Sequence, residues 1–183
     1  TKFDNALAYF ENNGCAMCVV AGDLTQTGLY RRTVESDAST TYSDEAQFVK
    51  YKEICDKHII PVYELMGNHE SYYSMPIANN LDKMETYTGK GALSYTATQG
   101  NDLFILCGQP RGSMVMSDED FAWLTETLEA NTDKRCFVFV HSYIEEDSGD
   151  PGDHRENSVF DDGNWGSEKT TAFVDLLKQY ENV

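Results

Sequence analysis

The chain has 183 residues, 40% of them hydrophobic and 25% charged, which is ordinary for a soluble globular domain. Its 31 acidic and 14 basic residues give a formal net charge of -17, without the basic stripe by which nucleic-acid-binding proteins neutralise phosphates. No apolar run approaches the roughly 20 residues needed to span a bilayer. We therefore expect a single domain over residues 1–183, with no nucleic-acid-binding surface and no membrane span.

The first elements expected are a helix and a buried strand. Phe3, Leu7 and Phe10 recur at helical spacing, and a glycine ends the run. Residues 15–21 are apolar throughout, which is typical of a strand buried on both faces. Residues 24–41 are rich in Thr, Ser and Gly, and we expect a loop there.

The five cysteines do not form a recognisable framework, because an odd number cannot pair completely within one chain. Cys15 and Cys18 form a C-x-x-C pair, which in other settings holds zinc or carries redox chemistry. Residues three apart on a strand point to opposite faces, so the two thiols cannot easily share a metal. We expect both cysteines to pack in the interior.

Helices and strands alternate along the rest of the chain, which predicts an α/β fold. Ser43 and Ser117 are good N-caps for two of the helices. The expected elements are a helix from residue 43, a strand over 61–66, a helix over 77–87, a hairpin of 93–98 with 102–107, a helix from residue 117, a strand over 136–140 and a helix over 167–180. The acidic residues 145–166 are expected to form a solvated loop, with control of substrate access as the alternative.

Metal-capable side chains follow three of the expected strands. Asp23 comes after Gly22, Asn68 comes after Gly67, and His141 follows the strand over residues 136–140. Glycine allows a sharp turn and a close approach of the backbone, and Asp, Asn and His offer ligands that suit Mn, Fe, Zn or Mg. Ligand sites in open α/β sheets form at the carboxyl ends of strands. Each residue alone has a simpler explanation as a turn or strand-end residue, but the three in this order favour a metal site.

These blocks resemble the calcineurin-like metallophosphoesterases, a family with five ordered motifs: D-x-H, G-D, G-N-H-[DE], a histidine after a strand, and G-H-x-H. Gly22 and Asp23 are similar to the second motif, residues 67–70 read G-N-H-E like the third, and His141 resembles the fourth. The order and spacing match over most of the chain, and G-N-H-E is the most specific part.

The resemblance implies a fold, a ligand set and a reaction. The fold would be two sheets packed face to face with helices outside. Asp23 would bridge two divalent ions, Asn68 and His141 would bind the second ion, and His69 would contact the phosphoryl group or assist the leaving group. The reaction would be hydrolysis of a phosphomonoester or phosphodiester by a hydroxide that bridges the two ions.

The first and last family motifs do not occur in this chain, and family spacing would place them before Thr1 and after Val183. We expect the chain to be a central part of the catalytic domain that holds at most one ion. The alternative is a relative that has lost catalysis and serves as a binding module. A serine hydrolase is disfavoured because no G-x-S-x-G surrounds Ser142. The location stays open between the cytoplasm and export, since a leader preceding Thr1 could have been removed.

Overall fold

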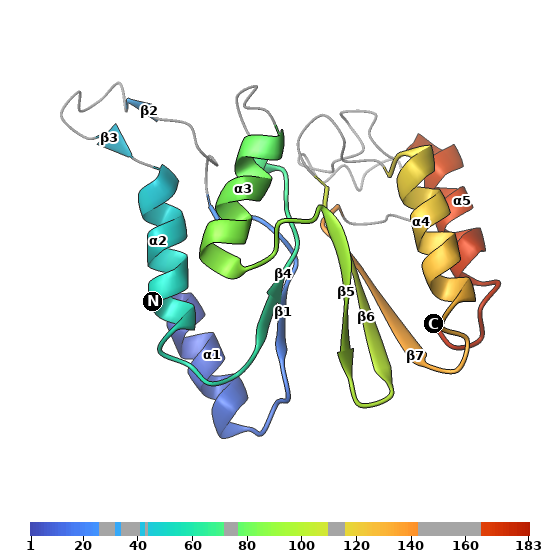
Figure 1. Ribbon diagram of the computed structural model, residues 1–183, viewed down its shortest axis with the longest axis horizontal. Coiled ribbons are helices and arrows are strands. Elements are labelled where there is room, and N and C mark those ends of the chain that lie inside the picture. Colours follow the sequence, from blue (N-terminus) through green and yellow to red (C-terminus); the bar gives the residue numbers. More distant parts are fainter. Residues whose placement is uncertain (26–31, 34–40, 43, 72–76, 110–115, 143–165) are drawn as a thin grey trace, which may run out of the picture.

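Two sheets with helices outside them make up the fold in the computed structural model (Figure 1), which describes residues 1–25, 32–33, 41–42, 44–71, 77–109, 116–142 and 166–183. The helices are α1 (Lys2–Asn12), α2 (Asp44–Cys55), the short 3-10 helix η1 (His69–Ser71), α3 (Ile77–Thr88), α4 (Asp118–Glu129) and α5 (Gly166–Leu177). The strands are β1 (Cys18–Val20), β2 (Arg32–Thr33), β3 (Thr41–Tyr42), β4 (Val62–Glu64), β5 (Ser94–Gln99), β6 (Asp102–Cys107) and β7 (Arg135–Val140).

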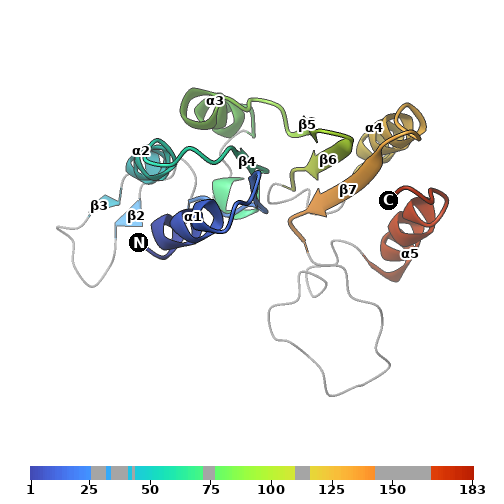
Figure 2. The same ribbon diagram turned by 90° about the horizontal axis from the view of Figure 1, so that it is seen from below.

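The first sheet pairs β1 with β4 in parallel, and the second has the order β5-β6-β7. In the second sheet, β5 and β6 form the predicted antiparallel hairpin, and β7 joins β6 in parallel. Figures 1 and 2 show α1 and α2 outside the first sheet and α4 and α5 outside the second. This arrangement confirms the predicted two-sheet α/β class. The carboxyl ends of β1, β4, β6 and β7 lie at one edge of the molecule (Figure 1).

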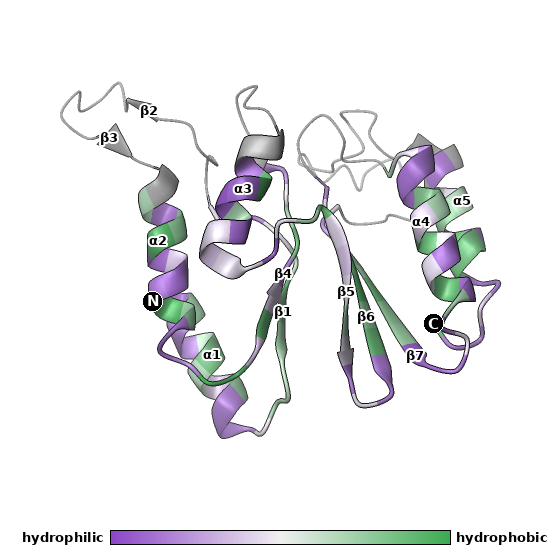
Figure 3. Ribbon diagram, in the orientation of Figure 1, coloured by the Kyte–Doolittle hydropathy of each residue, from purple (hydrophilic) through white to green (hydrophobic). Residues whose placement is uncertain are grey.

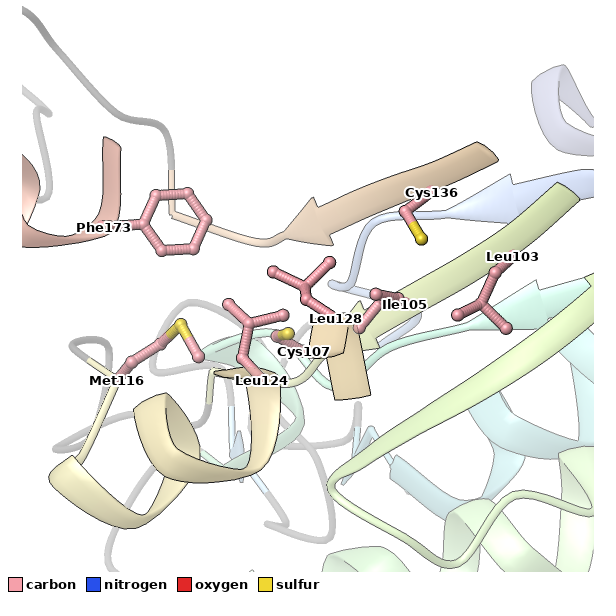
Figure 4. Packing of buried hydrophobic residues seen from close by; sticks show 8 residues of the cluster. All are labelled: Leu103, Ile105, Cys107, Met116, Leu124, Leu128, Cys136 and Phe173. Atoms are coloured by element: carbon pink, nitrogen blue, oxygen red, sulfur yellow. The ribbon is translucent and has the colours of Figure 1, made fainter. Parts of the chain in front are cut away.

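Apolar faces of α4 and α5 pack on β6 and β7 and form the larger core (Figure 4). Its buried members are Leu103, Ile105, Cys107, Met116, Leu124, Leu128, Cys136 and Phe173. Ser117 begins α4 with a capping box, in which its side chain accepts from the Asp120 N–H and the Asp120 carboxylate accepts from the Ser117 N–H. In Figure 3 apolar residues lie along β6 and β7, whereas β5 is pale to hydrophilic. No helix in the described part of the chain has the length and apolar character to cross a membrane.

The prediction for residues 15–21 is wrong at its start. The strand begins at Cys18, and Cys15 is exposed, with its backbone N–H donating to the Phe10 carbonyl at the end of α1. Cys15 therefore belongs to the end of α1 and not to the strand. Of the two cysteines, only Cys18 packs in the core as expected. The strand expected over residues 61–66 is also shorter, although Leu65 and Met66 beyond it are fully buried.

Two further differences concern the connections. The loop expected over residues 24–41 contains β2 and β3, a short antiparallel pair whose two-residue strands carry too little periodicity to be recognised. The last helix ends at Leu177, three residues earlier than expected. Ser43 and the acidic loop over residues 145–166 lie outside the described residues, apart from Gly166, which begins α5.

A charged cluster joins α1 to the turn that follows α2. The partly buried His58 lies 2.9 Å from Asp4 and 3.0 Å from Glu11, and Glu11 also accepts from the backbone N–H groups of Ile59 and Ile60. Hydrogen bonds that His58 donates to the carboxylates of Glu11 and Asp4 raise the pKa of His58. The same histidine lowers the pKa of Asp4 and of Glu11.

The cluster predicts a pH window of stability. The His58 contribution is fully present below about pH 6.5 and is lost as pH rises through its raised folded pKa. The two carboxylates contribute above about pH 4.3, and this is lost as pH falls through their lowered pKa values. Urea unfolding of the parent and of His58→Gln should therefore differ most between about pH 4.3 and 6.5. Lys50→Gln, which breaks the exposed pair with Glu53, should show no such maximum. A pH-independent difference for His58→Gln would contradict this assignment.

Candidate metal centre

The structure brings the predicted site residues together from both sheets. Asp23 follows β1, Asn68 follows β4 and His141 follows β7, so all three leave the carboxyl ends of parallel strands. The Nε2 atom of His141 lies 2.8 Å from Asn68 Oδ1 and 3.3 Å from Asp23 Oδ1. Residues separated by more than a hundred positions in the sequence thus meet at one point.

Two glycines allow this close approach. Gly22 has φ of +90°, and a Cβ atom there would lie 2.6 Å from His141 Nδ1. A Cβ on Gly67 would fall on the Asp23 carboxylate, and it would also lie 2.6 Å from the Asp23 backbone nitrogen. Asp23 itself has φ of +58°, a conformation that is uncommon for residues other than glycine and is one that Asp adopts more readily than most. The G-D and G-N pairs are therefore explained by packing of one loop against the other.

The tautomer of His141 follows from its backbone contact. Its Nδ1 lies 2.7 Å from the Ala21 carbonyl oxygen, which can only accept, so Nδ1 carries the proton. In the neutral ring Nε2 then presents a lone pair to the oxygens of Asn68 and Asp23. Three electron-pair donors facing one another repel unless a cation or a proton lies among them. A cation among the three donors would relieve this repulsion.

The two distances from His141 Nε2 to Asn68 and Asp23 are those expected between neighbouring ligands of one divalent ion. Adjacent ligands about 2.1 Å from an octahedral ion lie about 3.0 Å apart, close to the two distances measured from His141 Nε2. The site is mixed in chemistry, with one carboxylate, one amide oxygen and one imidazole, which suits borderline and hard metals. Among the described residues, no cluster of three or more His, Cys, Asp or Glu side chains could hold a metal ion. The candidate ligand set of Asp23, Asn68 and His141 falls outside that definition because its third member is an amide.

Glu70 holds the two loops in place, a role that sequence reasoning did not assign. Its fully buried carboxylate accepts from the backbone N–H groups of Asp23 at 2.9 Å, Thr25 at 2.8 Å and Gly67 at 2.7 Å. Burial raises the pKa of Glu70, and the hydrogen bonds that it accepts from the three backbone N–H groups oppose that rise. Glu70 is the fourth residue of the G-N-H-E motif, so the sequence did contain it. Its hydrogen bonds to the distant residues Asp23 and Thr25 are apparent only from the structure.

His69 lies beside the convergence point without joining it. Its backbone N–H donates to Asp23 Oδ1 at 3.1 Å, and its Nε2 lies 4.0 Å from Asp23 Oδ2. The side chain is 26% exposed, so it can reach a molecule bound at this edge. This placement is compatible with the contact to a phosphoryl or leaving group that the resemblance implies.

The comparison with protein families agrees with this geometry. A model of the calcineurin-like phosphoesterase family matches residues 2–178. The chain belongs to the calcineurin-like phosphoesterase family. A search of curated proteins found no match. As a member of this family, the protein is expected to act on phosphoesters with divalent metal ions.

A separate cavity of about 540 Å³ lies between α2, α3 and β4 of this phosphoesterase chain. Its walls contain none of the four predicted site residues. Its wall contains two ion pairs, because Lys90 lies 3.0 Å from the buried Glu64 carboxylate and Lys52 lies 2.8 Å from Asp56. Burial raises the pKa of Glu64, and the nearby Lys90 ammonium opposes the rise.

Proposed function

We propose that this chain contributes the second-metal half of a centre that hydrolyses phosphomonoesters or phosphodiesters. Asp23, Asn68 and His141 bind one divalent ion, and the complete centre uses two. Membership of the calcineurin-like phosphoesterase family supports the general reaction. The observation that carries the ligand assignment is the convergence of three electron-pair donors on one point, at 2.8 and 3.3 Å from His141 Nε2.

Asp23 is the residue best placed to serve two ions. Its Oδ1 faces His141, while its Oδ2 lies on the side of His69. Asp23 would hold both ions, and the backbone N–H of His69 donates to its Oδ1 and keeps the carboxylate in orientation. When bound, the ions would polarise the phosphoryl oxygens and lower the pKa of a bound water.

The protein groups around the ions bind, orient and transfer protons. The Ala21 carbonyl keeps the proton of His141 on Nδ1, which leaves Nε2 unprotonated for metal binding. His69 Nε2 donates a proton or a hydrogen bond to the leaving oxygen, a role that typically contributes about 10²- to 10⁴-fold in rate. The substrate is a phosphorylated small molecule or another phosphoester.

The first test is Mn²⁺ binding to the 183-residue chain by calorimetry, beside His141→Ala. The parent should bind about one ion. The variant should bind at least about 100-fold more weakly, because loss of a direct ligand exceeds the effect of losing a residue that only supports one. His58→Ala is the matched control, since His58 pairs with Asp4 and Glu11. It should leave the affinity unchanged.

Hydrolysis is tested on the natural gene product with p-nitrophenyl phosphate and bis-p-nitrophenyl phosphate in Mn²⁺. Turnover of either compound that His141→Ala abolishes supports the proposal and distinguishes monoesterase from diesterase activity. Binding of the ion without turnover of either substrate would favour a non-catalytic binding module. Undiminished turnover in His141→Ala would refute the assignment of this centre.

A further inference from the structure

The metal ligands come from two different sheets, so their spacing depends on how the sheets are joined. Asp23 and Asn68 follow strands of the β1–β4 sheet, whereas His141 follows β7 of the other sheet. A small shift between the sheets would change the distances at His141 Nε2 directly. A contact that ties the two sheets beside the ligands would therefore determine the geometry of the centre.

Gln109 makes such a contact at both ends. Its backbone N–H donates to the carbonyl of Met66, the residue before Gly67, at 2.8 Å. Its side-chain Oε1 accepts from the backbone N–H of Ser142, the residue after His141, at 2.5 Å. The β6–β7 ladder ends at Cys107 and Val140. Gln109 and Ser142 each lie two residues beyond it, where no ladder holds the chain.

The surroundings of Gln109 make this link rigid. The residue is 1% exposed and Ser142 is also 1% exposed, so water does not compete for the hydrogen bond between them. A buried amide that lost its partner would carry a desolvation cost, which keeps the side chain in this one orientation. Gly108 precedes it and donates to the Leu93 carbonyl at 3.0 Å, which fixes the backbone on the other side.

We infer that Gln109 is a positioning residue for the metal centre, acting through His141. This inference rests on the function proposed above. By tying the residue after His141 to the residue before Gly67, Gln109 sets the distance between the imidazole and the ligands of the first sheet. Gln109 itself does not bind the ion. Residues that orient metal ligands typically change metal affinity or activity about 10- to 100-fold when replaced.

The test compares Gln109→Met with Gln109→Glu. Methionine keeps the length and apolar volume but removes the acceptor, and Mn²⁺ affinity should fall about 10- to 100-fold. Glutamate retains an acceptor oxygen in either protonation state, so Gln109→Glu should lose less Mn²⁺ affinity than Gln109→Met. Hydrogen exchange of the Ser142 amide in the metal-free chain should become faster in Gln109→Met only. Equal losses in both variants would show that the Ser142 contact is not responsible.

A double-mutant cycle separates positioning from a general loss of folding. If Gln109 acts through His141, adding Gln109→Met to His141→Ala should weaken the residual Mn²⁺ binding by no more than about twofold. A full additional 10-fold loss would overturn the inference. The parent and His141→Ala distinguish the two proposals, because a parent that binds no Mn²⁺ refutes the proposed function and this inference with it. A parent whose affinity depends on His141 but not on Gln109 refutes this inference alone.

Discussion

Asp23→Asn is expected to reduce Mn²⁺ affinity more than any other single substitution in the chain, by well over about 100-fold. The side chain keeps its shape, and its amide oxygen can still accept from the His69 N–H, which lies 3.1 Å from Asp23 Oδ1. What is lost is the only negative charge among the three proposed ligands. Attraction between a carboxylate and a divalent ion in contact is several kcal/mol even at an effective dielectric of about 20. Calorimetry with Mn²⁺ measures the change directly.

The control is Asp175→Asn, at an exposed position on α5 far along the chain from the centre. It makes the same change in net charge and should leave Mn²⁺ affinity within about twofold of the parent. If both variants weakened binding equally, the long-range field of this acidic chain would explain the affinity. If Asp23→Asn bound Mn²⁺ like the parent, Asp23 would not be a ligand.

Glu70→Ala is expected to give a large loss of stability. The buried backbone N–H groups of Thr25 and Gly67 and the partly buried N–H of Asp23 would lose their acceptor together. Each unpaired buried donor costs about 1 to 3 kcal/mol, so the two buried groups alone should lower the free energy of unfolding by at least about 2 kcal/mol. Urea unfolding of the metal-free chain measures this loss without any contribution from a bound ion.

Glu70→Gln should fall between the parent and Glu70→Ala. Its one remaining oxygen can still accept, while its amide group presents donors to an N–H group that needs an acceptor. The exposed Glu53→Gln, which removes an ion pair with Lys50, should change stability by less than about 1 kcal/mol. If Glu70→Gln were as stable as the parent, the charge and second acceptor of Glu70 would be unimportant for the two loops.

Local sequence patterns were sufficient to predict the longer helices and strands. The helical spacing of Phe3, Leu7 and Phe10 lies in α1, and the hairpin around Gly100 forms between β5 and β6 as expected. These elements depend on neighbours in the chain, and Gly100 adopts the positive φ that the turn needs. The prediction for Cys15 was wrong because an apolar residue beside a helix end can close that helix instead of entering a sheet.

The sequence by itself determined which residues are candidates for the centre. Asp23, Asn68 and His141 were selected from their positions after glycines and strand ends, and His69 from the resemblance of residues 67–70 to a family motif. The structure places all four at one edge. The sequence did not reveal what supports them. The partners of His58, and the roles of Glu70 and Gln109, depend on hydrogen bonds to residues more than 30 positions away. Such contacts leave no periodic trace in the sequence, because only the packing of the two sheets decides which distant backbone groups need a partner.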